Sequence, residues 1–141
     1  MGEFDHANLQ SELLTWLRNS AVEWGVRALA EQRVQISSAR FRVPDICVLR
    51  RDLSIEQIVR HAPLICIEVL SKDDSLHDIR ERVDDYIRMG VAHVWLLDPA
   101  SRKAYVCTEK GMNEPQDGEL HVPETPIRIS LTDLFDRLDK A

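Results

Sequence analysis

Two carboxylates, Asp45 and Glu68, stand in stretches of sequence that are otherwise apolar. Glu68 is the one charged residue in the run from Leu64 to Leu70, which is typical of a strand buried on both faces. Desolvating a carboxylate costs several kcal/mol unless a cation or hydrogen-bond donors compensate. Asp45 lies in a second apolar stretch, so both carboxylates reach the same end of a sheet if the two strands pair. Two close carboxylates repel unless a divalent cation bridges them, and oxygen ligands suit Mg²⁺ or Mn²⁺.

A structural alternative is open for both residues. Glu68 can pair with an arginine, and Asp45 can accept a turn hydrogen bond, because buried ion pairs are common without any metal. In the metal-binding interpretation, magnesium held at the strand ends orients and activates a water for phosphodiester hydrolysis. The residue pattern alone favours neither metal binding nor the structural alternative.

One α/β domain spanning residues 1–141 is expected to position these carboxylates. Apolar spacing predicts helices over 5–24 and 75–89, a short helical turn over 54–60, and a strand followed by a terminal helix within 127–138. Further strands are predicted over 33–37, 42–49, 64–70, 93–98 and 104–108, with a loop or weak hairpin over 111–126. The order of strand, helix and strand from 64 to 98 predicts a βαβ unit.

The charge balance limits how the protein can bind nucleic acid. The chain has 141 residues, with 18 Lys and Arg against 24 Asp and Glu, which gives a net charge of −6. Phosphate contacts need a basic surface, so this balance argues against a protein that binds nucleic acid by charge alone. The first sixty residues are neutral, however, and they contain the arginines at which a phosphate backbone can approach, namely Arg33, Arg40, Arg42, Arg50 and Arg51.

Several other classes of protein are excluded by missing patterns. No apolar run reaches the ~18 residues of a membrane span, and the N-terminus lacks the order of a secretory signal, so a cytoplasmic protein without a membrane partner is expected. The five histidines and three cysteines show no spacing that binds zinc. A glycine-rich phosphate loop and a GxSxG serine elbow are also absent.

The order of motifs along the chain resembles the Uma-type family of bacterial endonucleases, within the PD-(D/E)xK restriction-endonuclease-like superfamily. The matching segments are Val43-Pro44-Asp45, Ile67-Glu68-Val69-Leu70-Ser71, the helix from Asp78 to Tyr86, and Gly90 to Pro99. This resemblance implies a restriction-endonuclease-like α/β fold with an αβββαβ core, in which a central mixed sheet is flanked by helices. It also implies that Asp45, Glu68 and the carbonyl of Val69 bind the catalytic metal, and that Glu31 is an additional acid.

The chain departs from the superfamily pattern at the position of the motif lysine, where Leu70 stands. In Uma-type proteins the basic residue typically moves to the following helix, and the matching position here is Arg82. An arginine is effectively never deprotonated, so its role is electrostatic rather than that of a general base. A surface ion pair with Asp78 or Asp85 is the competing interpretation of Arg82. Lys72, on the turn after the strand, is a second candidate, although a solvated turn residue is the simpler interpretation.

Three hypotheses follow for the whole chain. The first is a Mg²⁺-dependent endonuclease that hydrolyses the phosphodiester bonds of DNA, with Mn²⁺ as an alternative ion and a homodimer to supply two sites for two strand cuts. The second is a catalytically weak or inactive nuclease-fold protein that acts as a binding or regulatory module. The third is a structural ion-pair network without metal.

Overall fold

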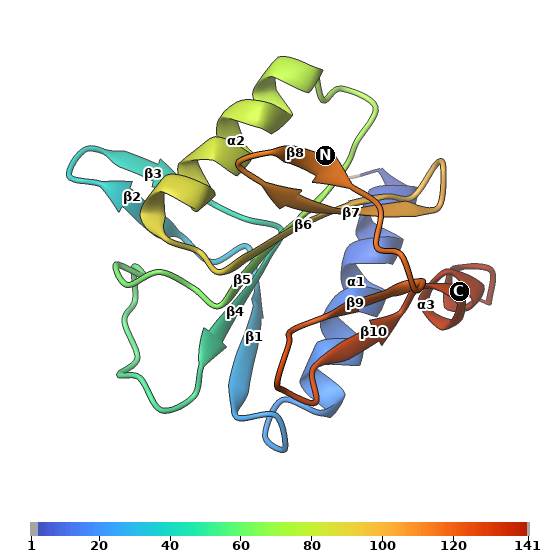
Figure 1. The fold of residues 1–141 in the computed structure, drawn as a ribbon, viewed down its shortest axis with the longest axis horizontal. Coiled ribbons are helices and arrows are strands. Elements are labelled where there is room, and N and C mark those ends of the chain that lie inside the picture. The colour runs from blue at the N-terminus through green and yellow to red at the C-terminus, as the bar shows by residue number, and fades with distance from the viewer. Residues whose placement is uncertain (1–2, 141) are drawn as a thin grey trace.

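Six strands form a central mixed sheet in the computed structural model, which describes residues 3–140. Their spatial order is β1 (Val26–Ala30), β4 (Ile46–Arg50), β5 (Ile65–Val69), β6 (His93–Asp98), β7 (Lys103–Thr108) and β8 (Gly111–Asn113). Strands β5 and β6 are parallel, and the other neighbouring pairs are antiparallel (Figure 1). The prediction of a mixed sheet that contains a βαβ unit is therefore confirmed.

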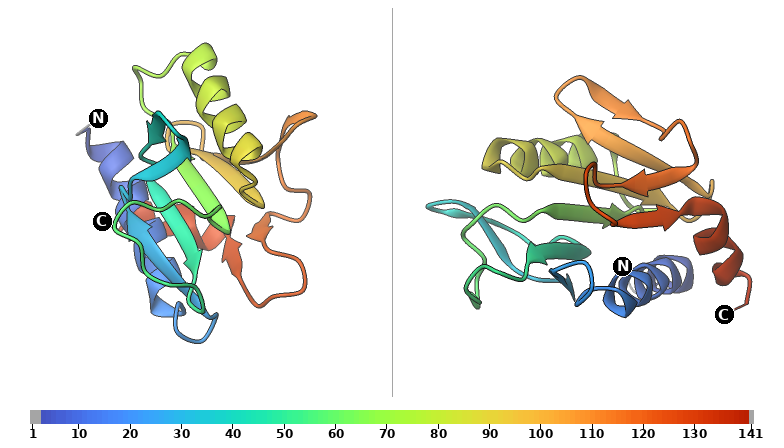
Figure 2. Two further views of the ribbon diagram at one scale, coloured as in Figure 1. Left: turned by 90° about the vertical axis from the view of Figure 1, so that its left-hand side faces the viewer. Right: turned by 60° about the horizontal axis from the view of Figure 1, so that its bottom comes forward.

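Helices cover both faces of this sheet. Helices α1 (Phe4–Asn19) and α3 (Leu131–Leu138) lie on one face, and α2 (Leu76–Met89) lies on the other (Figure 2). In chain order α1, β1, β4, β5, α2 and β6 give the predicted αβββαβ core. Two small hairpins complete the described chain: β2 (Val34–Ser37) with β3 (Arg40–Arg42), and β9 (Glu119–His121) with β10 (Arg128–Ser130). No helix within residues 3–140 has the length and apolar character needed to cross a membrane.

Alternation along β5 decides which way Glu68 points. Ile65, Ile67 and Val69 pack in the cluster that also contains the buried leucines of α1. Cys66 packs in the other cluster, against α2. Because successive strand residues point to opposite faces, Glu68 shares the face of Cys66 and is directed toward α2.

Helix α2 begins and ends where the sequence predicts. Ser75 is the N-cap, and its hydroxyl accepts a hydrogen bond of 3.1 Å from the backbone N–H of Asp78. Gly90 ends the helix in the left-handed region, at φ 98°, where a side chain would be strained. The helix is thereby fixed between β5 and β6, with its apolar side on the sheet.

The N-terminal third differs from the sequence prediction. Helix α1 ends at Asn19 rather than near residue 24, and a turn leads through Gly25, at φ 69°, into β1. Strand β1 was not predicted, because its two alanines carry little strand preference and its pairing with β4 determines its structure. The predicted strand over 33–37 lies outside the sheet as β2, and the predicted strand over 42–49 is divided at Val43–Asp45, which separates β3 from β4.

The predicted helical turn over 54–60 is wrong. This segment is irregular, with bends at 57–58, and Val59 forms a parallel bridge with Val34 through hydrogen bonds to the backbone of residues 33 and 35. Val59 is fully buried, whereas Ile55 is 69% exposed. The backbone pairing with β2 therefore prevails over the helical spacing of the isoleucines.

An ion-pair clamp holds the β2–β3 hairpin against α2. Arg40 and Arg42 each donate to both Glu81 and Asp85, at 2.7 to 3.0 Å. Asp85 is 4% exposed. Burial alone would raise the pKa of Asp85, but the hydrogen bonds from the two arginines outweigh it and hold the pKa below its usual value. Two of the arginines predicted to meet a phosphate backbone are thus already engaged by carboxylates.

Replacement of Asp85 by Asn should lower the free energy of unfolding by about 1–3 kcal/mol at pH 7, since hydrogen bonds to a buried charge are lost. The folded-state pKa of Asp85 is depressed, so its stabilisation is present above the unfolded value of about 3.9 and disappears as the pH falls through the folded value. Urea denaturation should therefore distinguish Asp85→Asn from the parent chain at pH 7, and the difference should shrink as the pH is lowered through the folded-state pKa of Asp85. Asp84→Asn, at an exposed position, is the control and should match the parent throughout this pH series.

Candidate metal centre

Asp45 and Glu68 lie at the same end of the sheet. Ile46 pairs with Ile67 in the antiparallel register of β4 and β5, which brings the start of β4 beside the end of β5. The Asp45 Oδ2 atom accepts a hydrogen bond of 2.7 Å from the backbone N–H of Val69, the residue directly after Glu68. Asp45 is therefore fixed to the backbone at the end of the strand that carries Glu68.

Glu68 is held on both oxygens by side chains of α2. Arg82 Nη1 donates to Oε1 at 2.8 Å, and the Tyr86 hydroxyl donates to Oε2 at 2.7 Å. Arg82 and Tyr86 lie four residues apart, so they project from the same side of the helix. Burial, followed by the charge of Asp45, raises the pKa of Glu68 to about 7, although both hydrogen bonds favour the ionised form. Ionisation of both carboxylates is therefore unfavourable unless more positive charge is placed at this strand end.

Arg82 bridges two carboxylates. Its Nη2 atom donates to Asp74 Oδ1 at 2.5 Å, while Asp74 Oδ2 accepts the backbone N–H of Ser71 at 2.9 Å. The surface pairing with Asp78 or Asp85 that the helical spacing allowed does not form. Arg82 is thereby directed into the site, and Asp74 joins it as a residue to which the sequence analysis gave no role.

Helix α1 supplies two further residues to the site. His6 Nε2 lies 3.3 Å from Asp45 Oδ2, and Gln10 Nε2 donates to the Asp45 carbonyl at 2.9 Å. Gln10 also reaches Glu31 Oε2 at 3.4 Å, and the Glu31 backbone N–H donates to the same Asp45 carbonyl. The sequence analysis gave His6 and Gln10 no role, although their spacing of four residues near a helix start was a usable signal.

A cavity of about 400 Å³ opens at Asp45. It is lined by His6, Ala7, Gln10, Glu31, Val43, Asp45, Val69, Ser71, Asp74 and Arg82. The structure thus brings four of the predicted site residues, Asp45, Val69, Glu31 and Arg82, around one space. Glu68 does not line this space, but its Oε1 atom accepts a hydrogen bond from Arg82, which does. Lys72 is exposed and lines a neighbouring cavity of about 150 Å³ instead.

The donor set fits a magnesium-type ion better than a zinc-type ion. Within residues 3–140, no three His, Cys, Asp or Glu side chains are grouped so as to hold a metal by themselves. Zinc sites require three or four protein ligands, whereas Mg²⁺ keeps several waters and needs one or two carboxylates. Asp45 and Glu68, whose charges repel, meet that smaller requirement.

Comparison with solved structures gives the class of protein. The chain is similar to a structure described as "Crystal structure of a putative nuclease belonging to DUF820 from Anabaena variabilis ATCC 29413". The identity is 27%, the TM-score is 0.80, and the match covers 98% of this chain and 84% of that chain. A chain of a structure described as "cryoEM structure DrdV-DNA complex" is 17% identical with a TM-score of 0.45, over 89% of this chain and 11% of that one. The protein has the restriction-endonuclease-like α/β fold, as the sequence predicted.

The chain belongs to the family described as "Uma2: Putative restriction endonuclease", whose model matches residues 1–136. The resemblance inferred from the order of motifs is thereby confirmed. No curated protein matches the chain.

Proposed function

We propose that the protein is a metal-dependent endonuclease that hydrolyses phosphodiester bonds of DNA, with Mg²⁺ or Mn²⁺ as its cofactor. The observation that carries the proposal is the placement of Asp45 and Glu68 at one sheet end, beside a cavity of about 400 Å³. Membership of the nuclease family supports the same activity.

In this proposal Asp45, Glu68 and the carbonyl of Val69 hold the ion. A bound Mg²⁺ activates water and neutralises charge that develops on the phosphate oxygens. The chain's own residues keep the two carboxylates in place: the Val69 N–H fixes Asp45, and the Tyr86 hydroxyl fixes Glu68. Hydrogen bonds of this kind orient the side chains that bind a metal, and the donating N–H and hydroxyl groups do not bind the metal themselves.

Positive charge at the reacting phosphate is assigned to Arg82 in this proposal. Arg82 lines the cavity, and its guanidinium cannot serve as a base, so it acts by stabilising negative charge. Lys72 remains the alternative, because it is exposed on the turn between β5 and α2 and forms no ion pair with any residue of 3–140. Glu31 is proposed as an additional acid, since it lines the same cavity as Asp45.

The proposed substrate is DNA, and the proposed assembly is a homodimer in the cytoplasm. A net charge of −6 gives one subunit little electrostatic affinity for phosphate, and Arg40 and Arg42 are bound to α2 carboxylates. Two subunits would supply two active sites for two strand cuts and double the protein surface that contacts a DNA duplex. The single domain that the sequence predicts fits such a small subunit.

Plasmid cleavage tests the proposed activity. Purified protein should nick supercoiled plasmid when Mg²⁺ or Mn²⁺ is added, and a chelator should stop the reaction. Metal titration followed by thermal unfolding should show stabilisation of the folded chain, because an ion that binds only the folded state raises its stability. Metal stabilisation without cleavage of plasmid or single-stranded DNA would contradict an endonuclease and support a binding or regulatory module.

A binding or regulatory module without turnover is the second candidate, and Leu70 in place of the motif lysine favours it. Mg²⁺ or Mn²⁺ would stabilise such a module, but it would not cleave DNA.

A structural ion-pair network without metal is the third candidate, because both oxygens of Glu68 already accept hydrogen bonds from Arg82 and Tyr86. If Arg82 supplies all the positive charge that Glu68 needs, neither Mg²⁺ nor Mn²⁺ would change the unfolding temperature.

A further inference from the structure

Arg27 on the edge strand β1 has a charge that the chain does not neutralise. Its side chain is half-buried, and it forms no hydrogen bond or ion pair with any residue between 3 and 140. Its Nε atom is shielded from solvent and has no partner. A buried donor without a partner costs about 1–3 kcal/mol, so the free protein leaves an interaction of Arg27 unmade.

Two other half-buried arginines, Arg42 and Arg82, have acidic partners. Arg42 is 22% exposed and donates to two carboxylates, and Arg82, at 23%, also donates to two. The chain has 24 acidic residues, yet none of them reaches Arg27. Its Nε atom is too deeply shielded to meet a ligand, but its two terminal nitrogens are not shielded and have no partner within residues 3–140, and this end of a guanidinium binds a carboxylate through two parallel hydrogen bonds.

Arg27 lines a cavity whose wall is largely apolar. The cavity encloses about 200 Å³ under the segment that follows β4, and its apolar lining is Leu29, Leu49, Leu53 and Ile55. Drug-sized pockets occupy about 300–1,000 Å³, so this space suits a smaller molecule. Leu29 and Arg27 share one face of β1, which places apolar surface beside the guanidinium.

A second polar atom without a partner belongs to the same cavity wall. His61 Nδ1 lies 2.7 Å from Glu56 Oε1. The other ring nitrogen, Nε2, is shielded from solvent and has no partner within residues 3–140. Both orphaned groups, Arg27 and His61, line this one cavity.

We propose that the cavity between β1 and the segment 53–61 binds a small organic carboxylate, with the carboxylate on Arg27 and the apolar body against Leu29, Leu49 and Leu53. A nucleic-acid phosphate fits less well, because the space is small, most of its lining area is apolar, and Glu56 lies in its wall. The site lies apart from the candidate metal centre, since the two cavities have no lining residue in common.

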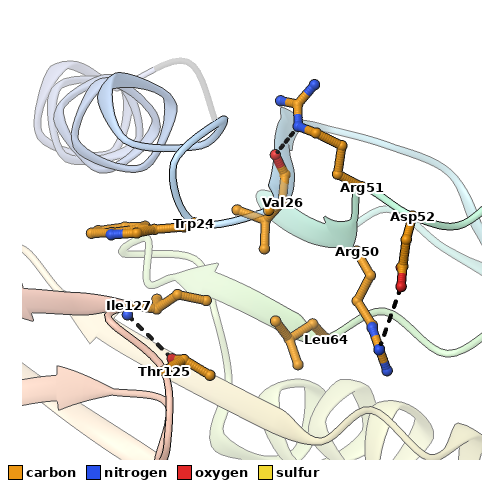
Figure 3. Close-up of a pocket in the computed structure, with 9 residues that line it drawn as sticks. Trp24, Val26, Arg50, Arg51, Asp52, Leu64, Thr125 and Ile127 are labelled. Carbon is orange, nitrogen blue, oxygen red and sulfur yellow. Dashed lines mark hydrogen bonds and ion pairs between the residues drawn. The ribbon is translucent and has the colours of Figure 1, made fainter.

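A larger cavity next to it offers no such group. This cavity of about 640 Å³ lies between the start of β1 and the loop before β10, and it is lined by Trp24, Arg50 and Arg51 among others (Figure 3). Arg51 Nε already donates to the Val26 carbonyl at 3.1 Å, and Arg50 lies 3.7 Å from Asp52. Arg50 lines both cavities, and it and Arg51 have partners, whereas Arg27 lines only the smaller cavity and its side chain has no partner within residues 3–140.

Titration of the ¹⁵N-labelled full chain with benzoate tests the proposal by nuclear magnetic resonance. The amide signals of Leu29, Leu49 and Leu53 should shift with saturation. Acetate, which lacks the apolar ring of benzoate, and benzyl alcohol, which lacks its negative charge, should each bind at least about tenfold more weakly than benzoate. Arg27→Met keeps the aliphatic stem and should weaken benzoate at least about tenfold, since a charge-assisted hydrogen bond is lost.

Two further variants keep this test decisive. Leu53 is 41% exposed, so Leu53→Ala should fold normally and weaken benzoate about threefold through lost apolar contact. Arg18→Met, at an exposed position of α1, is the charge-matched control and should bind benzoate as the parent does. Absence of benzoate shifts at these amides overturns the proposal, as does equal binding by Arg27→Met. Arg27-dependent binding of single-stranded DNA without benzoate binding would assign the site to nucleic acid instead.

Discussion

Asp45→Asn should reduce metal-dependent DNA cleavage by at least about 100-fold without unfolding the protein. Loss of a residue that merely orients a metal ligand typically costs about 10–100-fold, and Asp45 is proposed as a ligand itself. The asparagine side-chain oxygen can still accept the Val69 N–H, so the backbone contact at this strand end survives. The measurement is the initial rate of plasmid nicking with Mg²⁺, together with the unfolding temperature.

The same substitution should leave stability equal or raised in the absence of metal. The charge of Asp45 is one cause of the raised pKa of Glu68, so removing that charge relieves repulsion at a buried carboxylate. Added Mg²⁺ should then stabilise Asp45→Asn less than the parent. Asp73→Asn, at an exposed position on the turn before α2, is the control for a lost carboxylate and should cleave normally. Parent-like nicking by Asp45→Asn would remove Asp45 from the metal site.

The sequence predicted the part of the site that depends on local pattern. Glu68 stands out because a charge interrupts a buried strand, and alternation then directs it to one face whatever surrounds the sheet. The βαβ unit and the extent of α2 are likewise encoded within short windows, and the structure has the helix within one residue of the predicted range. A motif order spread over most of the chain carried the family assignment.

The partners of these residues depend on packing that no short window contains. Gln10 meets Asp45 across 35 positions, and Tyr86 meets Glu68 across 18. Strand β1 is determined by its pairing with β4, and the segment 54–60 by its bridge to β2, so local preference misjudged both. Arg82 shows most directly why local pattern is insufficient. Helical spacing predicts ion-pair partners for it on its own helix, but in the fold it pairs with Glu68 and Asp74.

Arg82→Ala should lower both cleavage and stability, and metal should restore the stability alone. Removing one partner of a buried ion pair costs up to about 3–5 kcal/mol, because Glu68 is left uncompensated. Protonation of Glu68 will limit this loss at acidic pH, since burial already raises its pKa to about 7. Loss of a group that stabilises charge in the transition state should reduce nicking by about 10²–10³-fold.

Added Mg²⁺ separates the two roles of Arg82. Arg82 occupies Glu68 Oε1, so its removal frees an oxygen for the ion, and saturating Mg²⁺ should raise the unfolding temperature of Arg82→Ala more than that of the parent. Nicking should stay low in this metal-loaded variant, because the ion replaces the lost charge beside Glu68 but not the contact with the phosphate. Arg80→Ala, at an exposed position two residues before Arg82 on α2, controls for the loss of an arginine. Normal nicking by Arg82→Ala would transfer the electrostatic role to Lys72, and an absence of metal stabilisation in both proteins would leave Arg82 as the only cation that Glu68 requires.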